Sequence, residues 1–247
     1  MALETFPWHD VLSLRAEWRL RQESAEACAT RLGQMLEALE PLHSGFPLLM
    51  WTGGRMRPLY PLPEHVDDFA PLFRPERIYD EGRKRRLQDG FSFTADARME
   101  HGRFIVIHIR AGRHVDCDGP DAGPNYVSIA TVIHDPDGED REMWRAQWPA
   151  LLTVIAAWEP ERAGAFSHEL GALTHDPARP SFFNGAWASY VDAKRAQRVS
   201  IPPEAVAGWS ADGGLMLLVT DGILNGADQK HRQVLGDIHA ALAAVFC

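Results

Sequence analysis

The chain has 247 residues and a formal net charge of −9, from 34 acidic and 25 basic residues. Apolar residues make up 45% of it and charged residues 24%, which is typical of a folded globular protein and excludes a disordered chain. The acidity disfavours binding to nucleic acid through its phosphates and favours a basic partner. A chain of this length buries a substantial core, as one large domain or two small lobes.

The cysteines and the N-terminus indicate the compartment. Cys28, Cys117 and Cys247 are widely spaced, so they indicate neither a disulfide framework nor a CxxC site. The start "MALETFPWHDV" lacks the basic and apolar regions of a signal peptide. No apolar run approaches the roughly 18 residues that span a membrane. We therefore expect a reduced, cytoplasmic protein with no membrane contact and no cofactor.

Periodicity in the first half predicts a strand, a helix and then a sheet. Apolar residues alternate over 11–19, as in a half-buried strand, and they recur at helical spacing over 24–39 until Pro41. Prolines and glycines make 41–90 irregular, with short helices. A hairpin of 91–98 and 104–111, with a third strand at 126–134, predicts antiparallel sheet.

The second half adds two amphipathic helices. The first covers 138–158, where we expect Pro149 to kink or split it. After a loop-rich part with short strands come a strand at 215–220 and a final helix that Asp228 caps. The predicted class is α+β, with antiparallel sheet packed against helices. The repeated strand and helix also suggest two similar lobes, 1–112 and 125–247.

The stretch "HDPDGEDREMW" at 134–144 holds five carboxylates in eight positions, 135–142. A calcium loop needs glycine where Asp140 stands and a bidentate acid where Ala146 stands, so that interpretation fails. The start of a helix fits better, because Asp137 can cap it and the acids face its positive end. For the surplus charge beside Trp144, a solvated helix start with a core tryptophan is the commoner outcome, and a protein interface is the alternative that stays open.

Motifs for catalysis are weak. The sequence has no GxSxG elbow, P-loop or GxGxxG, and the zincin-like "SHELGALTH" has Ala172 where the second histidine belongs. The loop with His114 and Cys117 offers only two of the four Cys/His ligands usual for structural zinc.

One enzyme alternative stays open, a metal-dependent nuclease or phosphohydrolase. Restriction-type nucleases join a Pro-Asp to an acid-x-Lys, so that two carboxylates hold Mg²⁺ while the lysine supports attack by water. Asp121 or Asp137 would supply the first part, and Asp192 with Lys194 the second. At least 54 residues separate these parts, and "WASYVDAKRA" does not read as a core strand. The match is therefore best explained by chance.

The order of features resembles the immunity protein 52 family of bacterial polymorphic toxin systems. The resemblance covers nearly the whole chain and is carried by "LRAEWRLRQES", "ACATRLGQMLEAL", "LLTVIAAWEPERA", "GAWASYV" and "GGLMLLVT". The family pattern has glycine directly before tryptophan, where this chain reads Gly185-Ala186-Trp187. Membership implies a single immunity domain over 1–247. It also implies a non-catalytic cytoplasmic protein that binds and neutralises a cognate toxin, such as a nuclease-type type VI effector.

The resemblance fixes no interface residues, so those are predicted from charge and aromatic placement. A basic nuclease domain would be steered to acidic groups and gripped by aromatic ones. The predicted partner-binding residues are Asp135, Asp137, Glu139, Asp140, Trp144, Glu159, Glu161 and Trp187.

Overall fold

A computed structural model describes the chain in segments, which form two compact units. The described residues are 10–39, 50–52, 59–61, 66–79, 86–98, 104–114, 123–133, 141–168, 170–171, 182–221 and 226–246. Unit 1 comprises Met1–Arg15, Val132–Leu151 and Pro160–Cys247, and unit 2 comprises Ala16–Thr131 and Leu152–Glu159. The units alternate along the chain, a division different from consecutive lobes at 1–112 and 125–247. Helices and antiparallel strands occur in both, which confirms the α+β class.

Three elements contribute to both units: strand β7 (Asn125–Ile133) begins in unit 2 and ends in unit 1, and two others run the opposite way. Strand β1 (Asp10–Trp18) and helix α2 (Arg141–Trp158) each begin in unit 1 and end in unit 2. Helix α2 runs through Pro149 without a break, so the expected split is wrong. A proline removes one backbone hydrogen bond. Here the loss is tolerated because the turns around it are anchored by buried side chains such as Ala150 and Leu151.

Unit 2 holds an antiparallel sheet and a helix. Its elements are α1 (Ala25–Leu39), β2 (Met50–Thr52), β3 (Leu59–Pro61), the 3-10 helix η2 (Val66–Leu72), β4 (Arg74–Tyr79), β5 (Arg86–Arg98), β6 (Phe104–Ala111) and β7 (Asn125–Ile133). The strand order is β7-β6-β5-β2-β3, with β4 also paired to β5. The predicted hairpin and third strand are therefore confirmed.

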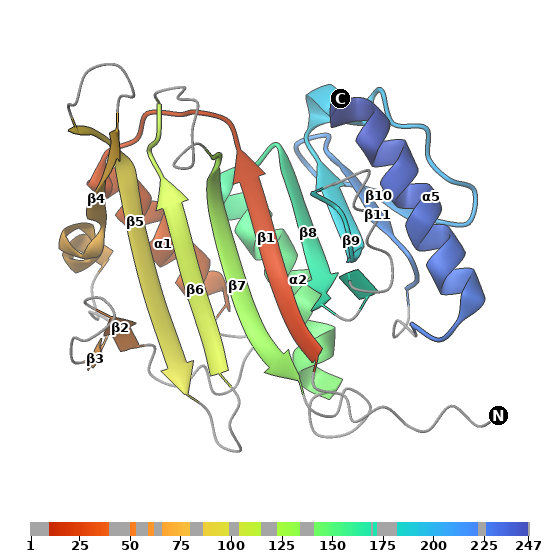
Figure 1. Cartoon of the computed structure of the whole chain (residues 1–247), viewed down its shortest axis with the longest axis horizontal. Coiled ribbons are helices and arrows are strands. Elements are labelled where there is room, and N and C mark those ends of the chain that lie inside the picture. The colour runs from red at the N-terminus through yellow and green to blue at the C-terminus, as the bar shows by residue number, and fades with distance from the viewer. Residues whose placement is uncertain are drawn as a thin grey trace. The chain divides into compact units, whose positions relative to one another are not determined.

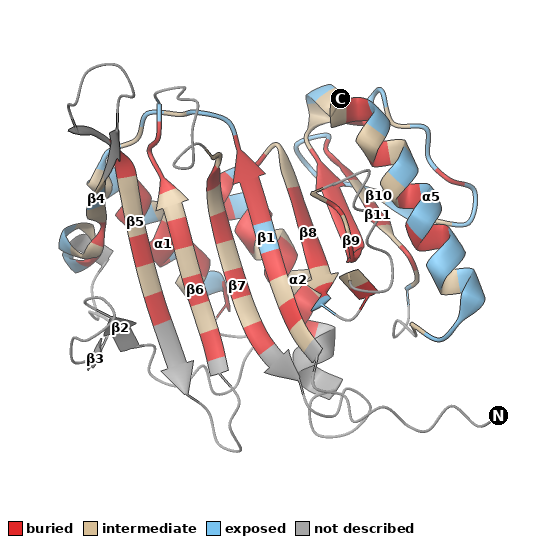
Figure 2. Ribbon diagram, viewed as in Figure 1, coloured by how far each residue is buried: buried red, intermediate tan, exposed pale blue. Residues whose placement is uncertain are grey.

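The core of unit 2 follows from the two periodicities of its sequence. Along β6, Ile105, Ile107 and Ile109 are buried while the residues between them are partly exposed, and Figure 2 shows this alternation along the strand. Helix α1 lies across the buried face of the sheet (Figure 1). Ser24 caps α1, because its Oγ accepts the Ala27 N–H at 3.2 Å.

The buried stripe of α1 includes a thiol. Cys28 is fully buried, and burial raises the pKa of its thiol to about 12. This cysteine is a core residue, as its position on the apolar stripe of the helix predicts.

Unit 1 holds a second group of antiparallel strands, in the order β10-β11-β9-β8. Its elements are β8 (Arg162–Ser167), β9 (Ala186–Val191), α4 (Ala193–Ala196), β10 (Val206–Trp209), β11 (Leu215–Leu218) and α5 (Gln229–Phe246). Every residue of β9 is buried, so the expectation that "WASYVDAKRA" contains no core strand is wrong. A strand buried on both faces shows no polar alternation, the signal that the expectation required.

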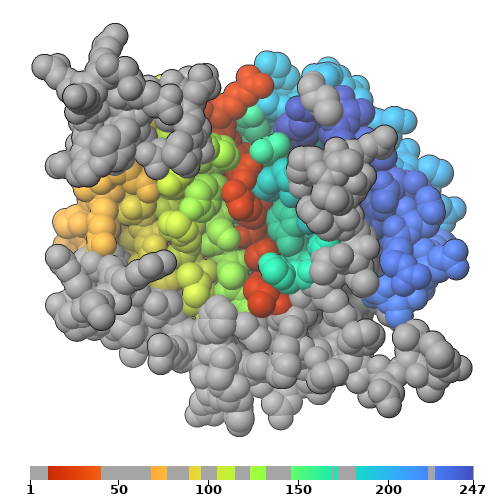
Figure 3. Space-filling model, in the orientation of Figure 1, coloured from red at the N-terminus to blue at the C-terminus, as the bar shows by residue number. Residues whose placement is uncertain are grey.

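Helix α5 closes the core of unit 1, and Figure 3 shows its outer side at the surface of this unit. Asp228 caps the helix as expected, with Oδ1 accepting the Lys230 N–H at 2.7 Å. The side chains that this helix buries are Val234, Leu235, Ile238, Leu242 and Val245. None of the helices in the described ranges is long and apolar enough to cross a membrane.

Candidate partner-binding surfaces

The acidic stretch that the sequence singles out lies outside the described residues. This applies to Asp135, Asp137, Glu139 and Asp140. Trp144 belongs to helix α2, but its side chain is also outside the described part. Their place in a binding surface therefore stays a prediction from charge.

Glu159, in unit 2, joins the end of α2 to two arginines. Its carboxylate accepts a hydrogen bond from Arg31 at 3.0 Å and lies 3.7 Å from Arg21, while 67% of the side chain stays exposed. The same arginines donate to the last carbonyls of the helix, Arg31 to Ala157 at 2.7 Å and Arg21 to Trp158 at 3.1 Å. These bonds satisfy carbonyls that a helix end leaves without partners.

The backbone of Glu159 is strained for a residue with a side chain. Its φ is 48°, in the left-handed region that usually holds glycine after a helix. A glycine at this position would have no side chain. The Glu159 side chain instead places an exposed carboxylate at the end of the helix, where it pairs with Arg31. Glu159 is thus available to a basic partner only in competition with these arginines.

Glu161, in unit 1, belongs to an ion-pair cluster with Asp192. The Arg195 guanidinium donates to Glu161 and to Asp192, both at 2.6 Å. Asp192 also caps α4, its Oδ1 accepting the Arg195 N–H at 3.0 Å. The side chains of Glu161 and Asp192 are about one quarter exposed. The ion pairs with Arg195 therefore stabilise the fold, and part of each carboxylate stays accessible to solvent.

The alternative nuclease site falls on the same aspartate. Both carboxylate oxygens of Asp192 accept hydrogen bonds from Arg195, and Lys194 is exposed on the short helix that Asp192 caps. Asp121 and Asp137 lie outside the described residues. Within the described ranges, no three His, Cys, Asp or Glu side chains gather as metal ligands do.

Trp187 is a core residue of unit 1. Only 4% of it is exposed, so its ring packs inside the unit instead of being offered to a partner. The arrangement follows from its place in the fully buried strand β9. A tryptophan in a binding surface has to keep part of its ring accessible.

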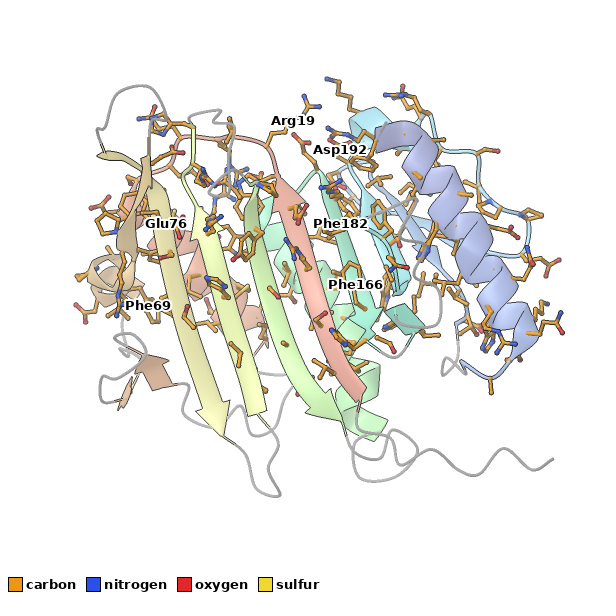
Figure 4. The ribbon with its side chains drawn as sticks, in the orientation of Figure 1. Arg19, Phe69, Glu76, Phe166, Phe182 and Asp192 are labelled. Atoms are coloured by element: carbon orange, nitrogen blue, oxygen red, sulfur yellow. The ribbon has the colours of Figure 1, made fainter. Side chains whose placement is uncertain are left out.

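An arginine and several phenylalanines form a partly exposed cluster in unit 1. The Arg162 guanidinium lies 4.6 Å from the Phe182 ring and 5.3 Å from the Phe246 ring. Phe166 meets Phe182 edge to face at 5.4 Å, and Figure 4 labels both. These cation–π and edge contacts fix the end of α5 against β8.

The open face of the unit 2 sheet carries a polar cluster that the sequence motifs do not single out. The Tyr126 hydroxyl and His108 Nδ1 are hydrogen bonded at 3.0 Å, and the Arg110 guanidinium lies 5.8 Å from the Tyr126 ring. Glu76, labelled in Figure 4, holds Arg110 at 2.8 Å. The alternation that predicts the strand also puts residues 108 and 110 on one face, so this signal was present in the sequence.

A buried ion pair stabilises one end of the same sheet. Arg113 is 1% exposed and its Nε lies 3.3 Å from a carboxylate oxygen of Asp89, which is wholly buried. The other oxygen of Asp89 accepts the His114 N–H at 2.8 Å, and Asn125 accepts the Arg113 N–H at 2.9 Å. Because these charges are buried and paired with each other, we interpret this ion pair as a structural feature of the sheet and not as a binding site.

The exposed apolar residues of unit 1 lie at the short strand β10. Trp209 is 59% exposed and Val206 is 40% exposed, and Ile201, shortly before the strand, is 40% exposed. Periodicity does not reveal this strand within a loop-rich region, because four residues are too few to show a period. The signal available was "VAGW" between the pair Pro202-Pro203 and the turn "SADGG".

Comparison with known proteins supports the fold class. No protein-family model matches the chain, and no curated protein matches it in sequence. Among solved structures, the fold is similar to that of "Pseudomonas aeruginosa T6SS protein PA0821", with a TM-score of 0.55 and 10% sequence identity. The similarity covers 96% of this chain and 73% of the other. At this identity, the likeness concerns the fold alone.

Proposed function

We propose that the chain is an immunity protein that binds and neutralises a cognate secreted toxin, without catalysing a reaction. The observation that carries the proposal is the likeness of fold, over 96% of the chain, to a protein of the type VI secretion system. The resemblance of the sequence to immunity proteins points to the same setting. Such a protein acts in the cytoplasm of the cell that makes the toxin.

The charge of the chain suits a nuclease-type toxin. A nuclease has to present positive potential in order to hold nucleic acid, so an acidic inhibitor is steered to the surface that it must cover. Unit 1 carries 16 acidic and 10 basic residues and therefore −6 of the net charge of −9. The acidic stretch 134–140 belongs to this unit. We expect unit 1 to make the first electrostatic contact with the toxin.

Co-expression tests the proposal directly. The full chain is produced together with the toxin encoded by the neighbouring gene, and both growth of the cells and co-purification of the two proteins are measured. Rescue of growth with a stable complex is the expected result. A catalytically inactive toxin serves as the control for toxicity. Continued killing, with no complex recovered, would show that the chain is not the immunity protein of that toxin.

Charge reversal tests the electrostatic part. Replacing Asp137, Glu139 and Asp140 with lysine is expected to lower the association rate about tenfold or more at low salt, with little effect on dissociation. The exposed Glu37 of unit 2, changed to lysine, is the control. Equal association rates for all three proteins in stopped-flow mixing would remove the acidic stretch from the encounter surface.

A further inference from the structure

Strand β10 is the last strand in the described order of the unit 1 strands, where it pairs only with β11. The register joins Val206 to Leu218 and Trp209 to Leu215. The side of β10 away from β11 is therefore a sheet edge in the described part of the chain. An edge strand presents a row of backbone donors and acceptors that another extended chain can pair with.

The backbone groups that face this edge can be identified. The Ser210 N–H donates to the Gly214 carbonyl at 2.9 Å, so Ser210 points its backbone groups toward β11. Successive residues of a strand point these groups to opposite sides. Gly208 and Val206 therefore also face β11, while Ala207 and Trp209 point their N–H and C=O groups outward.

Among the described residues, the edge lacks the charged side chains and prolines that usually protect a strand against pairing. Natural sheets guard their edges with charged side chains, with prolines or with a covering element. The four residues of β10 include neither a charged residue nor a proline. Val206 and Trp209 are exposed instead, and Met216 and Leu218 of the neighbouring strand are partly exposed. These side chains would flank an added strand on both faces of the sheet.

We infer that β10 receives an extended segment of the toxin, which adds to the sheet as a further strand and packs an apolar side chain on Trp209. The inference rests on the proposed function and names the site through which the partner is held. Backbone pairing supplies the binding, and Trp209 selects the side chain of the segment. The acidic unit 1 favours a segment that is basic around this apolar residue.

A second copy of the chain is a poorer occupant of the same edge. Pairing two β10 strands would join only four residues from each copy, far less than the roughly 20 residues a side of a stable interface. Each copy also brings a net charge of −9. A toxin adds its own charged surface to the contact and does not depend on the short strand alone.

One backbone donor provides a sharp test. Ala207→Pro removes an outward N–H and leaves the bonds to β11 intact, and an edge strand tolerates proline at such a position. Ala207→Val keeps the N–H and is the matched control. With the toxin from the neighbouring gene, we expect Ala207→Pro to weaken binding about tenfold or more in calorimetry, while Ala207→Val changes it less than about threefold. Trp209→Ala should weaken binding about thirtyfold.

Hydrogen exchange gives an independent measurement on the same proteins. In the free protein the amides of Ala207 and Trp209 should exchange quickly, whereas in the complex they should be protected at least tenfold more than before. Circular dichroism and thermal unfolding of Ala207→Pro establish that the variant is folded.

The outcomes separate this inference from the proposed function. Rescue of growth by the wild type, together with equal affinity of a folded Ala207→Pro variant and unprotected edge amides, would overturn the edge site and leave the immunity function intact. Failure of the wild type to bind or to rescue would overturn the function itself. A dimer in sedimentation that Ala207→Pro converts to a monomer would show a second copy at the edge, and would also overturn the inference.

Discussion

His239 makes the stability of unit 1 depend on pH. It lies on α5, and its Nε2 atom is inaccessible to solvent, with no hydrogen-bond partner in the described part of the chain. Burial lowers the pKa of this imidazole to about 4, and a hydrogen bond with the Ala186 backbone offsets only part of the effect. Protonation of the native protein would therefore place a positive charge on a largely buried group.

The size and sign of the effect follow from linkage. In the unfolded chain the histidine takes up a proton near its ordinary pKa of 6.5, but in the folded chain only near a pKa of about 4. Because each tenfold loss of proton affinity corresponds to about 1.4 kcal/mol, the neutral imidazole contributes up to about 3 kcal/mol to the free energy of unfolding. This contribution is fully present above pH 6.5 and is lost as the pH falls from 6.5 to about 4.

Urea unfolding at about pH 7.5 and about pH 4.5 measures this contribution of His239 to the free energy of unfolding. Between these values, His239→Gln should lose about 2 to 3 kcal/mol less of its unfolding free energy than the wild type. Ala240→Gln, at an exposed position of the same helix, is the control and should follow the wild type. Carboxylates titrate in the same range, but they contribute equally to the three proteins. The reasoning is refuted if His239→Gln loses as much stability as the wild type.

Three further substitutions test the packing and the buried ion pair. Gly214→Ala should destabilise the protein by about 1–3 kcal/mol in urea unfolding, because its Cβ would clash with the buried Tyr190 ring. Gly236→Ala, an exposed helical position with nothing within 4 Å of the new Cβ, should instead stabilise by up to about 1 kcal/mol; equal effects at the two glycines would contradict this account. Asp89→Ala should cost about 3–5 kcal/mol, since it leaves the Arg113 charge buried without its partner. A loss below about 1 kcal/mol by thermal unfolding would mean that the arginine reaches solvent.

The sequence predicts best those helices and strands that have one buried face and one face exposed to solvent. The hairpin of β5 and β6 shows this alternation, as do the helical stripes of α1 and α5, and the structure has all of these elements. The sequence pattern does not reveal strand β9, because burial on both faces removes the alternation of apolar and polar residues. The pattern also overestimates the effect of Pro149 on helix α2, because buried side chains on both sides of the proline hold the helix together.

The candidate sites were harder to predict, since charge alone does not say whether a group is already paired. In the sequence, Glu161 and Asp192 are simply two acidic residues with no visible partner. In the structure, both pair with Arg195. Trp187 and Trp209 are both tryptophans near short strands, yet one is 4% and the other 59% exposed. Their difference comes from the order of the strands, with β9 inside the sheet and β10 at its edge. Strand order is a property of tertiary structure that no local pattern contains.

The alternation of the two units along the chain has a consequence for synthesis on the ribosome. Unit 2 lacks its last segment until residue 159 has been made, because Trp158 stacks on Trp18 at 5.3 Å and Glu159 holds Arg31. The start of β1, up to Arg15, belongs to unit 1 and waits still longer for β8, which begins at residue 162. Unit 2 can therefore close first during translation, while the start of β1 still lacks one of its two neighbouring strands.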